Sequence, residues 1–296
     1  MINVIRADIL GYCMGVRRAV EMAENCLENN VKTQGSVFSF GPLIHNKTAL
    51  KTLALKGLSV LDSENIDSLK HNDTVIIRAH GIPPKIRHKI ETTGAKIVDA
   101  TCPRVLSSQK RASNFAKKGF TIILAGDKNH GEVAGIAGCA ESFGAKCIVV
   151  ENVMDAKKIP QCNDKAILLS QTTISHKEYD DIARILQKRM EHFQVFDTIC
   201  PATSERQKSL EKLAKKVEGI IVIGGKNSAN TQRLFLASQK YCDDNAYECK
   251  ISCHIETPDE IPENFFQLKS IGITAGASTP DNIIDEVEEI LIGKSC

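Results

Sequence analysis

Three cysteines of this chain each open a helical pattern, and together they could hold a metal cluster. Cys102 and Cys200 lie 98 residues apart in matching segments, Asp-Ala-Thr-Cys-Pro and Asp-Thr-Ile-Cys-Pro, and Cys13 opens a third helical stretch. A helix N-terminus favours an anionic thiolate, and thiolates are the usual ligands of iron–sulfur clusters. Three ligands leave one iron of a 4Fe–4S cluster open, and an open metal ion binds substrate as a Lewis acid. Structural thiols that merely align are the alternative, because cysteine is commonly buried.

Polar side chains that suit an anion follow other predicted strands. Imidazoles, hydroxyls, amides and helix N-termini together fit a dianionic or trianionic group such as a diphosphate. No P-loop or G-x-G-x-x-G element follows a strand, so nucleotide binding has no support. The candidate anion ligands are His45, His80, His130, Ser228, Asn230 and Ser278.

One acidic residue, Glu132, lies two positions after His130 and is the only acid in a histidine-bearing motif of this kind. In a closed, metal-centred site it would be the natural proton donor. The alternative is an ordinary first-turn glutamate that the helix dipole stabilises.

An internal repeat positions these residues, and it indicates the architecture. The segments that follow Cys102 and Cys200 match again 28 residues later, and a more diverged copy begins at Cys13. Short apolar strands alternate with helical patterns, which indicates α/β units with mainly parallel sheets, and ligands of such sheets gather at the carboxyl ends of strands. We therefore predict three α/β domains related by pseudo-threefold symmetry, a trefoil whose strand ends face one centre. The predicted domains are 1–101, 102–196 and 197–296.

Composition indicates a soluble globular protein, with 42% apolar and 25% charged residues among 296. No apolar run approaches the ~20 residues needed to cross a bilayer. Arg6 and Asp8 interrupt the first apolar stretch, so a signal-peptide core is lacking and we expect a cytoplasmic protein without a membrane partner. A net charge of +2 and an aromatic content of 5% without Trp give no support to nucleic-acid binding.

The chain has eleven cysteines, which we expect to be thiols, metal ligands or catalytic groups rather than disulfides in a cytoplasmic protein. Cys242, Cys249 and Cys253 fall close together, but only the last two approach the spacing of zinc ligands. Alternation over residues 249–255 favours a plain strand there. We expect the remaining histidines at the surface: His71, His88, His176, His192 and His254.

Nine short motifs occur in order between residues 11 and 280. They are Gly-Tyr-Cys-Met-Gly-Val-Arg-Arg-Ala-Val (11–20), Gly-Pro-Leu-Ile-His-Asn (41–46), Arg-Ala-His-Gly (78–81), Asp-Ala-Thr-Cys-Pro (99–103), Asn-His-Gly-Glu (129–132), Ser-Gln-Thr-Thr (170–173), Thr-Ile-Cys (198–200), Lys-Asn-Ser-Ala-Asn-Thr (226–231) and Thr-Ala-Gly-Ala-Ser (274–278). In this combination they resemble the 4-hydroxy-3-methylbut-2-enyl diphosphate reductase family, which catalyses the last step of the methylerythritol phosphate route to isoprenoids.

The resemblance implies a trefoil around one 4Fe–4S cluster, with Cys13, Cys102 and Cys200 as ligands and one open iron. It implies that the anion ligands named above hold the substrate diphosphate. It also implies that Thr172 and Glu132 order the hydroxyl end and relay protons. The implied reaction removes the hydroxyl group reductively and yields isopentenyl and dimethylallyl diphosphates. Its two electrons come from an outside donor, ferredoxin or flavodoxin.

One position departs from the family pattern. Members commonly have Ser-Ser-Asn where this chain has Ser228, Ala229 and Asn230. A hydroxyl contact to the diphosphate is thereby lost, at a cost of roughly 1.5–3 kcal/mol if nothing replaces it. The backbone N–H of Ala229 could still bind the substrate.

Two other functions fit a cluster with three cysteine ligands. A hydro-lyase would dehydrate a hydroxy acid without net redox change and would favour arginines for carboxylates; Arg78 and Arg104 are near the strand ends, although His, Ser and Asn dominate there. A non-catalytic iron–sulfur sensor would need an effector surface such as a basic helix, and none is evident.

Overall fold

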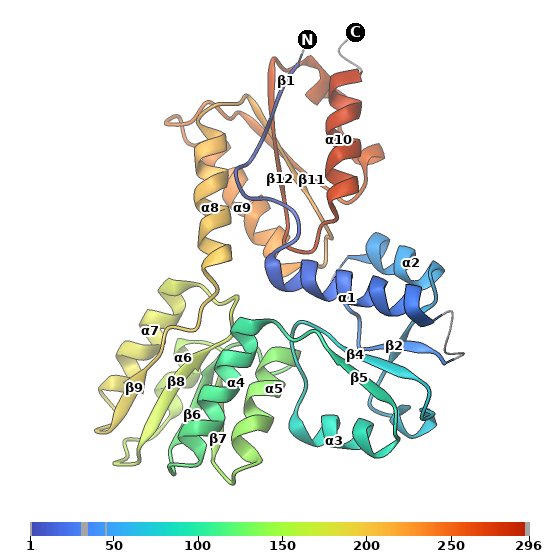
Figure 1. Ribbon diagram of the computed structural model, residues 1–296. Helices are drawn as coiled ribbons and strands as arrows, with labels where there is room; N and C mark the ends of the chain where they lie inside the picture. The colour runs from blue at the N-terminus through green and yellow to red at the C-terminus, as the bar shows by residue number, and fades with distance from the viewer. Residues whose placement is uncertain (1, 31–34, 45, 294–296) are drawn as a thin grey trace. The chain divides into compact units, whose positions relative to one another are not determined.

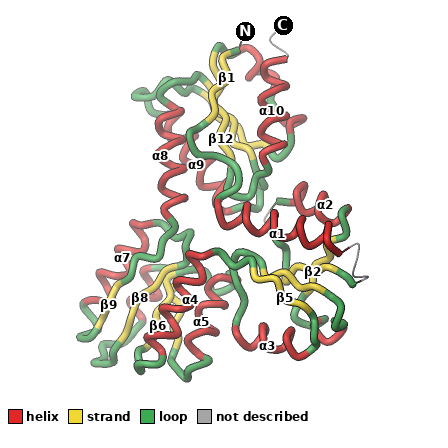
Figure 2. Tube along the Cα trace, in the orientation of Figure 1, coloured by secondary structure: helices red, strands yellow, loops and turns green. Residues whose placement is uncertain are grey.

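The computed structural model describes residues 2–30, 35–44 and 46–293, in which strands and helices alternate (Figures 1 and 2). Within these ranges, the strands form three sheets of four parallel strands each. In spatial order, the first sheet is β3 (Leu58–Leu61), β2 (Val37–Phe40), β4 (Thr74–Ile77) and β5 (Lys96–Asp99); the second is β7 (Cys147–Val150), β6 (Thr121–Ala125), β8 (Ala166–Ser170) and β9 (Phe193–Val195); the third is β11 (Ile251–Ile255), β10 (Gly219–Ile223), β12 (Ser270–Ala275) and β1 (Asn3–Arg6).

The three sheets have the same strand order, except for the origin of one strand. Each repeat contributes three consecutive strands: β2 to β4, β6 to β8 and β10 to β12. The first and third strands of each repeat form the central pair of the sheet, and the second strand lies at the edge next to the first. The fourth place is taken by β5 and β9 in two sheets, but by the N-terminal strand β1 in the third, where Asn3 is in register with Ser270. The domain limits 1–101, 102–196 and 197–296 stay a prediction, and β1, from the first of these ranges, pairs with β12 from the last.

The chain forms two compact units. One comprises Met1–Arg17, Ile44–Lys56 and Pro201–Cys296, and the other comprises Arg18–Leu43 and Gly57–Cys200. Helix α1 (Met14–Asn30) has residues in both. The first unit also has α2 (Lys47–Leu55), α8 (Pro201–Ala214), α9 (Ala229–Asp243) and α10 (Asp281–Gly293), and the second has α3 (Pro84–Thr92), α4 (Pro103–Ala116), α5 (Gly131–Glu141), α6 (Val153–Lys158) and α7 (His176–Gln187).

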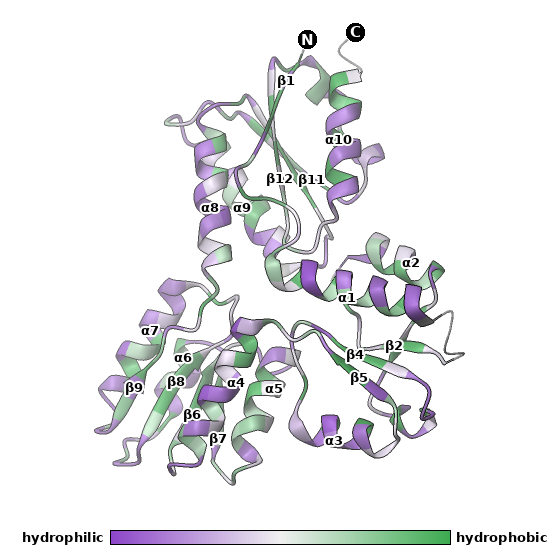
Figure 3. Ribbon diagram, viewed as in Figure 1, coloured by the Kyte–Doolittle hydropathy of each residue, from purple (hydrophilic) through white to green (hydrophobic). Residues whose placement is uncertain are grey.

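In the second unit, helices cover both faces of the sheet that contains β6. Ile122 and Leu124 pack against α4 and α5, whereas Ile123 and Ala125 pack against α6 and α7. Successive side chains of a strand point to opposite faces, and here both faces are buried. The strand is therefore a continuous apolar run, as the green colour of β6 and β8 shows (Figure 3).

The sheet of the first unit is buried in the same way. Ile221 and Ile223 of β10 pack against α10, and Ile220 and Val222 pack against α8 and α9. In Figure 1, α8 and α9 accordingly lie on one side of this sheet and α10 lies on the other. Both faces of this sheet are therefore covered by helices, and its strand ends lead into the polar turns described below.

The predicted α/β class with parallel sheets is confirmed. The trefoil arrangement around a central cluster stays a prediction. No described helix combines the length and the apolar character that a membrane crossing requires.

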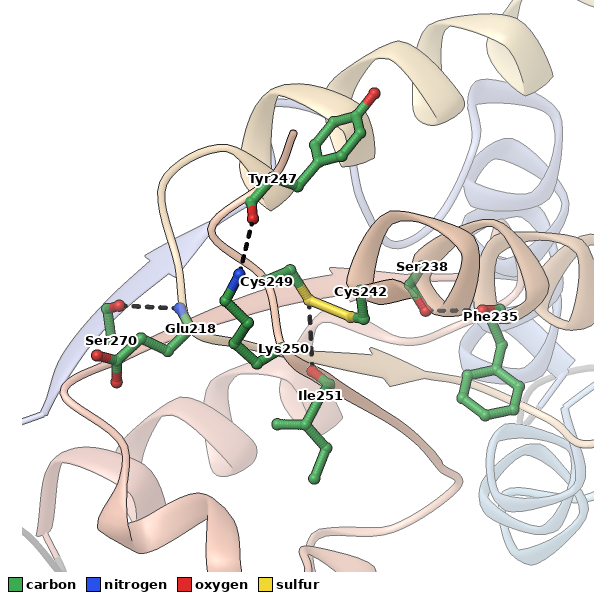
Figure 4. Close-up of a disulfide and its surroundings, with 9 residues drawn as sticks. All are labelled: Glu218, Phe235, Ser238, Cys242, Tyr247, Cys249, Lys250, Ile251 and Ser270. Atoms are coloured by element: carbon green, nitrogen blue, oxygen red, sulfur yellow. Dashed lines mark hydrogen bonds between the residues drawn. A yellow bond between two sulfur atoms is a disulfide. The ribbon is translucent and has the colours of Figure 1, made fainter. Parts of the chain in front are cut away.

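The expectation that no cysteine forms a disulfide was wrong. Cys242, in the last turn of α9, is bonded to Cys249, which lies just before β11 (Figure 4). The turn between them brings their Cα atoms to 4.7 Å, within the range that a disulfide spans. The predicted strand over residues 249–255 is therefore shorter: β11 begins at Ile251, and Cys249 is held against Ala214 by its backbone N–H at 3.1 Å.

Candidate active site

Each of the three candidate cysteines occupies the same place relative to a sheet. Its backbone N–H donates to a carbonyl oxygen two residues beyond the end of β4, β8 or β12, which brings the cysteine to the carboxyl edge of that sheet. These bonds join Cys102 N to Ala79 O at 3.0 Å, Cys200 N to Thr172 O at 2.8 Å and Cys13 N to Ala277 O at 3.2 Å. Equivalent positions in three like sheets argue against a chance alignment of structural thiols.

All three residues are half-buried thiols at the start of a helix. Cys102 is the N-cap of α4, and Cys13 and Cys200 directly precede α1 and α8. This donor set fits a metal–sulfide cluster, because a helix N-terminus stabilises thiolates. Cys13 belongs to one unit and the other two belong to the second. Within the described ranges, no three His, Cys, Asp or Glu side chains form a ready metal site, so a shared cluster stays a prediction.

Glu132 lies in the first turn of α5, is only 1% exposed and binds Thr172 through both carboxyl oxygens. The backbone N–H of Thr172 donates to Oε1 at 2.7 Å, and the Thr172 hydroxyl lies 2.8 Å from Oε2. Burial raises the pKa of Glu132 to about 7, although the two bonds from Thr172 act in the opposite direction. Near neutral pH this carboxyl group is therefore poised to give or take a proton.

His130 caps the same helix. Its Nδ1 accepts the backbone N–H of Glu132 at 3.3 Å, so a neutral His130 ring carries its proton on Nε2. The ring of His80 meets the ring of His130 edge to face, with centroids 4.9 Å apart. Two imidazoles and a helix N-terminus therefore lie together, as an anion site requires.

These contacts join the predicted residues of the second unit into one continuous path. Each step is a hydrogen bond, a peptide link or a ring contact. The path runs through Cys102, Ala79, His80, His130, Glu132, Thr172 and Cys200. Two of the predicted cluster ligands are thus connected through the predicted acid and its partner.

In the first unit, Ser228 and Asn230 lie at the start of α9, directly after the turn that follows β10. Ser228 is the N-cap, and its Oγ accepts the backbone N–H of Thr231 at 3.4 Å. Nδ2 of Asn230 is buried, and no described residue accepts a hydrogen bond from it. Buried polar groups are nearly always paired, with protein or with water, so an acceptor outside the described residues, a water molecule or a ligand, is expected beside this amide.

Ser278 is buried in the turn after β12, next to the carbonyl of Ala277 that holds Cys13. The neighbouring Thr279 donates its hydroxyl to the carbonyl of Ile223, the last residue of β10, at 3.0 Å. The turn that bears Ser278 is therefore tied both to the cysteine loop and to the strand end that precedes Ser228.

A buried arginine that the sequence analysis did not identify also fixes this region. Arg206 of α8 is 2% exposed and donates to the carbonyl of Gly11 at 2.7 Å and to that of Ala275 at 3.2 Å. It thus ties the loop before Cys13 to the end of β12. Its place in the sequence, in a helix with many exposed cations, carries no signal of this role.

Two candidate positions cannot be placed fully. His45 lies outside the described residues, as does the side chain of Ala229. One expected surface residue is not at the surface: His254 lies half-buried in β11, with Nε2 2.8 Å from the carbonyl of Gly224. The other four expected surface histidines are exposed: His71, His88, His176 and His192.

Fold and site together define a class of α/β proteins that present a cysteine at the carboxyl edge of each of three like parallel sheets. The family model described as LytB protein matches residues 4–292. The chain belongs to this family.

Similar proteins carry the name of one enzyme. A 4-hydroxy-3-methylbut-2-enyl diphosphate reductase of Treponema denticola is 47% identical, over 98% of this chain and 99% of its own length. A protein of the same name from Caldanaerobacter subterraneus is 41% identical, over 97% and 96%. A solved structure of (E)-4-hydroxy-3-methyl-but-2-enyl diphosphate reductase, described as the terminal enzyme of the non-mevalonate pathway, is 37% identical, with a TM-score of 0.79 and coverage of 99% and 100%. The reductase structure from Plasmodium falciparum is 28% identical, with a TM-score of 0.81 and coverage of 98% and 87%.

Proposed function

We propose that this chain is an oxidoreductase that removes the hydroxyl group of 4-hydroxy-3-methylbut-2-enyl diphosphate, as the last step of the methylerythritol phosphate pathway. The substrate accepts two electrons and two protons; its C–O bond breaks, water leaves, and a new C–H bond gives isopentenyl or dimethylallyl diphosphate. The electrons come from a small external carrier, ferredoxin or flavodoxin.

The observation that carries the proposal is the path from Cys102 to Cys200 through His80, His130, Glu132 and Thr172. It supports a site in which anion-binding imidazoles, a proton-holding carboxyl group and thiol ligands adjoin one another. Relatives that carry the reductase name over nearly their whole length support the assignment of this chemistry.

The geometry around Glu132 indicates where its proton resides. Oε1 accepts the backbone N–H of Thr172, which can only donate, so a proton on the carboxyl group occupies Oε2 and faces the Thr172 hydroxyl. While Glu132 is ionised, the Thr172 hydroxyl donates to Oε2. When Glu132 is protonated, the hydroxyl turns to accept from it and donates its own hydrogen outward. Glu132 is accordingly the proton source, and Thr172 is its outlet toward the substrate oxygen.

The diphosphate is held by hydrogen-bond donors of side chains and of helix N-termini. In the second unit these are Nε2–H of His130, His80 and the N-terminus of α5; in the first unit they are Ser228, Ser278 and the buried amide of Asn230. His45 and the backbone of Ala229 complete the proposed set. Such donors bind an anion without a permanent charge on each residue.

The cofactor is proposed to be one 4Fe–4S cluster held by Cys13, Cys102 and Cys200, with one iron lacking a protein ligand. When bound, it supplies the electrons and a Lewis-acidic iron for the leaving oxygen. The equivalent backbone bonds of the three cysteines support this ligand set, because each thiol is presented in the same way at a helix start.

The test is an anaerobic assay of the cluster-loaded protein with 4-hydroxy-3-methylbut-2-enyl diphosphate and a reduced low-potential dye. We expect dye oxidation together with formation of both five-carbon diphosphates. A hydro-lyase would act without the dye and would not oxidise it. A non-catalytic sensor would bind a cluster but turn over no substrate, and either result would refute the reductase.

A further inference from the structure

One cation at the candidate site has no counter-charge within the described part of the chain. Arg78 is the first residue after β4 and is half-buried, and its Nε is fully buried without a hydrogen-bond partner among the described residues. Burial alone lowers the pKa of its guanidinium, and no acidic group contributes to the shift. A half-buried cation with one buried N–H left unpaired among the described residues is costly, so this one calls for an explanation.

The guanidinium lies between two strand-end turns that have no side chain to block it. A Cβ atom added at Gly41, the residue after β2, would lie 3.1 Å from one terminal nitrogen, and a Cβ at Gly131 would collide with the other. Gly131 is the first residue of α5, directly between His130 and Glu132. The cation is therefore packed against a helix N-terminus, where the helix dipole repels it.

At the corresponding position of the second sheet, the polar atoms of the side chain are hydrogen-bonded. Gln171 is the first residue after β8 and packs on Gly126, the residue after β6. Its Oε1 accepts the backbone N–H of Asp127 at 2.9 Å, and its Nε2 donates to Thr173 at 2.9 Å. Arg78 occupies the same place but makes no comparable bond to any residue that the structure describes, and it adds a charge. A purely structural role at this position needs no cation.

We infer that the Arg78 guanidinium is a further anion-binding group, which compensates the negative charge of the diphosphate beside His80 and His130. An anion at this place offsets both the unpaired guanidinium and the positive end of α5. The identity of the anion rests on the proposed function; the demand for an anion rests on the geometry of Arg78 alone.

The test is calorimetric binding of inorganic diphosphate to the cluster-loaded protein, for the wild type, Arg78→Gln and Arg78→Lys. Arg78→Gln introduces the side chain that the second sheet has at this position. Loss of one charge-assisted contact predicts a Kd about ten- to a hundredfold higher, with a smaller dependence on salt. Arg78→Lys keeps the charge but loses the planar guanidinium with its several N–H donors, so its Kd should lie between those of the wild type and Arg78→Gln. In turnover, Arg78→Gln should raise KM more than it lowers kcat.

Arg184→Gln is the matched control, because it removes the same charge from an exposed arginine of α7 that pairs with Asp181 at 2.9 Å. It should bind diphosphate like the wild type. If Arg78→Gln lowers the melting temperature but leaves the Kd unchanged, the guanidinium is a packing group and the inference fails. If Arg78→Gln does not fold, Arg78→Lys is used instead: a higher Kd than the wild type supports the inference, and an unchanged Kd refutes it.

Failure of this inference and failure of the proposed function are distinguishable. Binding of inorganic diphosphate is measured without turnover, so a wild type that binds it but reduces no substrate refutes the function and leaves the Arg78 comparison valid. A wild type that reduces the substrate, with Arg78→Gln equal to it in both Kd and KM, overturns the inference alone.

Discussion

The backbone of Thr172 connects Cys200 with Glu132: its carbonyl accepts the Cys200 N–H at 2.8 Å, and its N–H donates to Glu132 at 2.7 Å. One peptide segment thus positions a candidate metal ligand and the candidate acid together. A displacement of either group displaces the other, so the carboxyl group of Glu132 keeps its place relative to the backbone of Cys200.

Replacement of the acid tests its role directly. Glu132→Gln keeps the size of the side chain, and the Thr172 hydroxyl can rotate to accept from the new amide, so the fold and the cluster should be retained. Turnover should fall by about a hundredfold or more, because a general acid typically contributes 10²–10⁴. Steady-state kinetics at equal cluster content measure this effect. Retained turnover would remove Glu132 from the acid role.

The same variant gives a stability prediction. The pKa of Glu132 is raised from an ordinary 4.5 to about 7 in the folded protein, so the folded state binds this proton more tightly than the unfolded state. Its favourable contribution is complete below about pH 4.5 and is lost as pH rises to about 7. The advantage of Glu132→Gln over the wild type in the free energy of unfolding should therefore grow by on the order of 3 kcal/mol across this window. Denaturant titrations between pH 5 and 8 would show it; a constant difference contradicts the assigned pKa.

The hydroxyl of Thr172 can be separated from its backbone. Thr172→Val keeps the N–H bond to Oε1 of Glu132 but removes the outlet for the proton, whereas Thr172→Ser keeps both. We expect Thr172→Val to lower kcat by one to two orders of magnitude with little change in KM, and Thr172→Ser to stay near the wild type. Equal kcat values for the two variants would argue that the hydroxyl does not relay protons.

The cluster ligands can be tested by iron and acid-labile sulfide content. Alanine at Cys13, Cys102 or Cys200 should each reduce bound iron and the visible absorbance, because three ligands leave no substitute. Cys26→Ala is the matched control, since Cys26 is a half-buried thiol within helix α1 and far from the strand ends in sequence. A full complement of iron in any of the three variants would exclude that cysteine as a required ligand.

The buried Arg206 gives a prediction about the loop of Cys13. Arg206→Met leaves the carbonyls of Gly11 and Ala275 without their charged donor, so the unfolding free energy should fall by roughly 3 kcal/mol. In cluster-free protein, alkylation of Cys13 should be faster than in the wild type. Mass spectrometry of the alkylated peptide reports this, with the rate at Cys102 as the internal reference; equal acceleration at both thiols would indicate general loosening instead.

Ala229, which stands where family members commonly have Ser, can be replaced by that serine. Ala229→Ser restores the common hydroxyl beside Ser228 and Asn230, and it should lower the KM for the diphosphate substrate by about tenfold, as expected for one hydrogen bond to a charged group. Competition by inorganic diphosphate should strengthen in parallel. No change in either constant would mean that the backbone at this position already provides the contact.

The alternation of strands and helices could be predicted from the sequence because the central strands of this fold are continuous apolar runs. Ile122–Ala125 and Ile220–Ile223 are buried on both faces, so each is a continuous apolar run ended by a polar turn, and the 98-residue repeat indicates that the two strands are equivalent. The polar residues that follow these strands could be recognised as strand-end residues because each apolar run ends where they begin.

What the sequence could not reveal depends on contacts between distant segments. Nothing in residues 3–6 indicates β12 as their partner. Nothing in the sequence around Arg206 shows that it is buried, and nothing around Arg78 shows that its Nε is buried. The tautomer of a neutral His130 ring depends on the N-cap geometry that turns Nδ1 toward the N–H of Glu132. Predicted roles of the cysteines, histidines and serines stay predictions until the variants above are measured.

The pairing of β1 with β12 has a consequence for how the protein is made. Cys102 and Cys200 take their backbone partners from residues shortly before them, so both can be positioned while the ribosome is still at work. Cys13 takes its partner from Ala277, near the end of the chain, and its strand stays without a neighbour until then. The first of the three cysteines to be synthesised is therefore the last to gain its backbone partner, and all three could hold the proposed cluster only after Ala277 has been made.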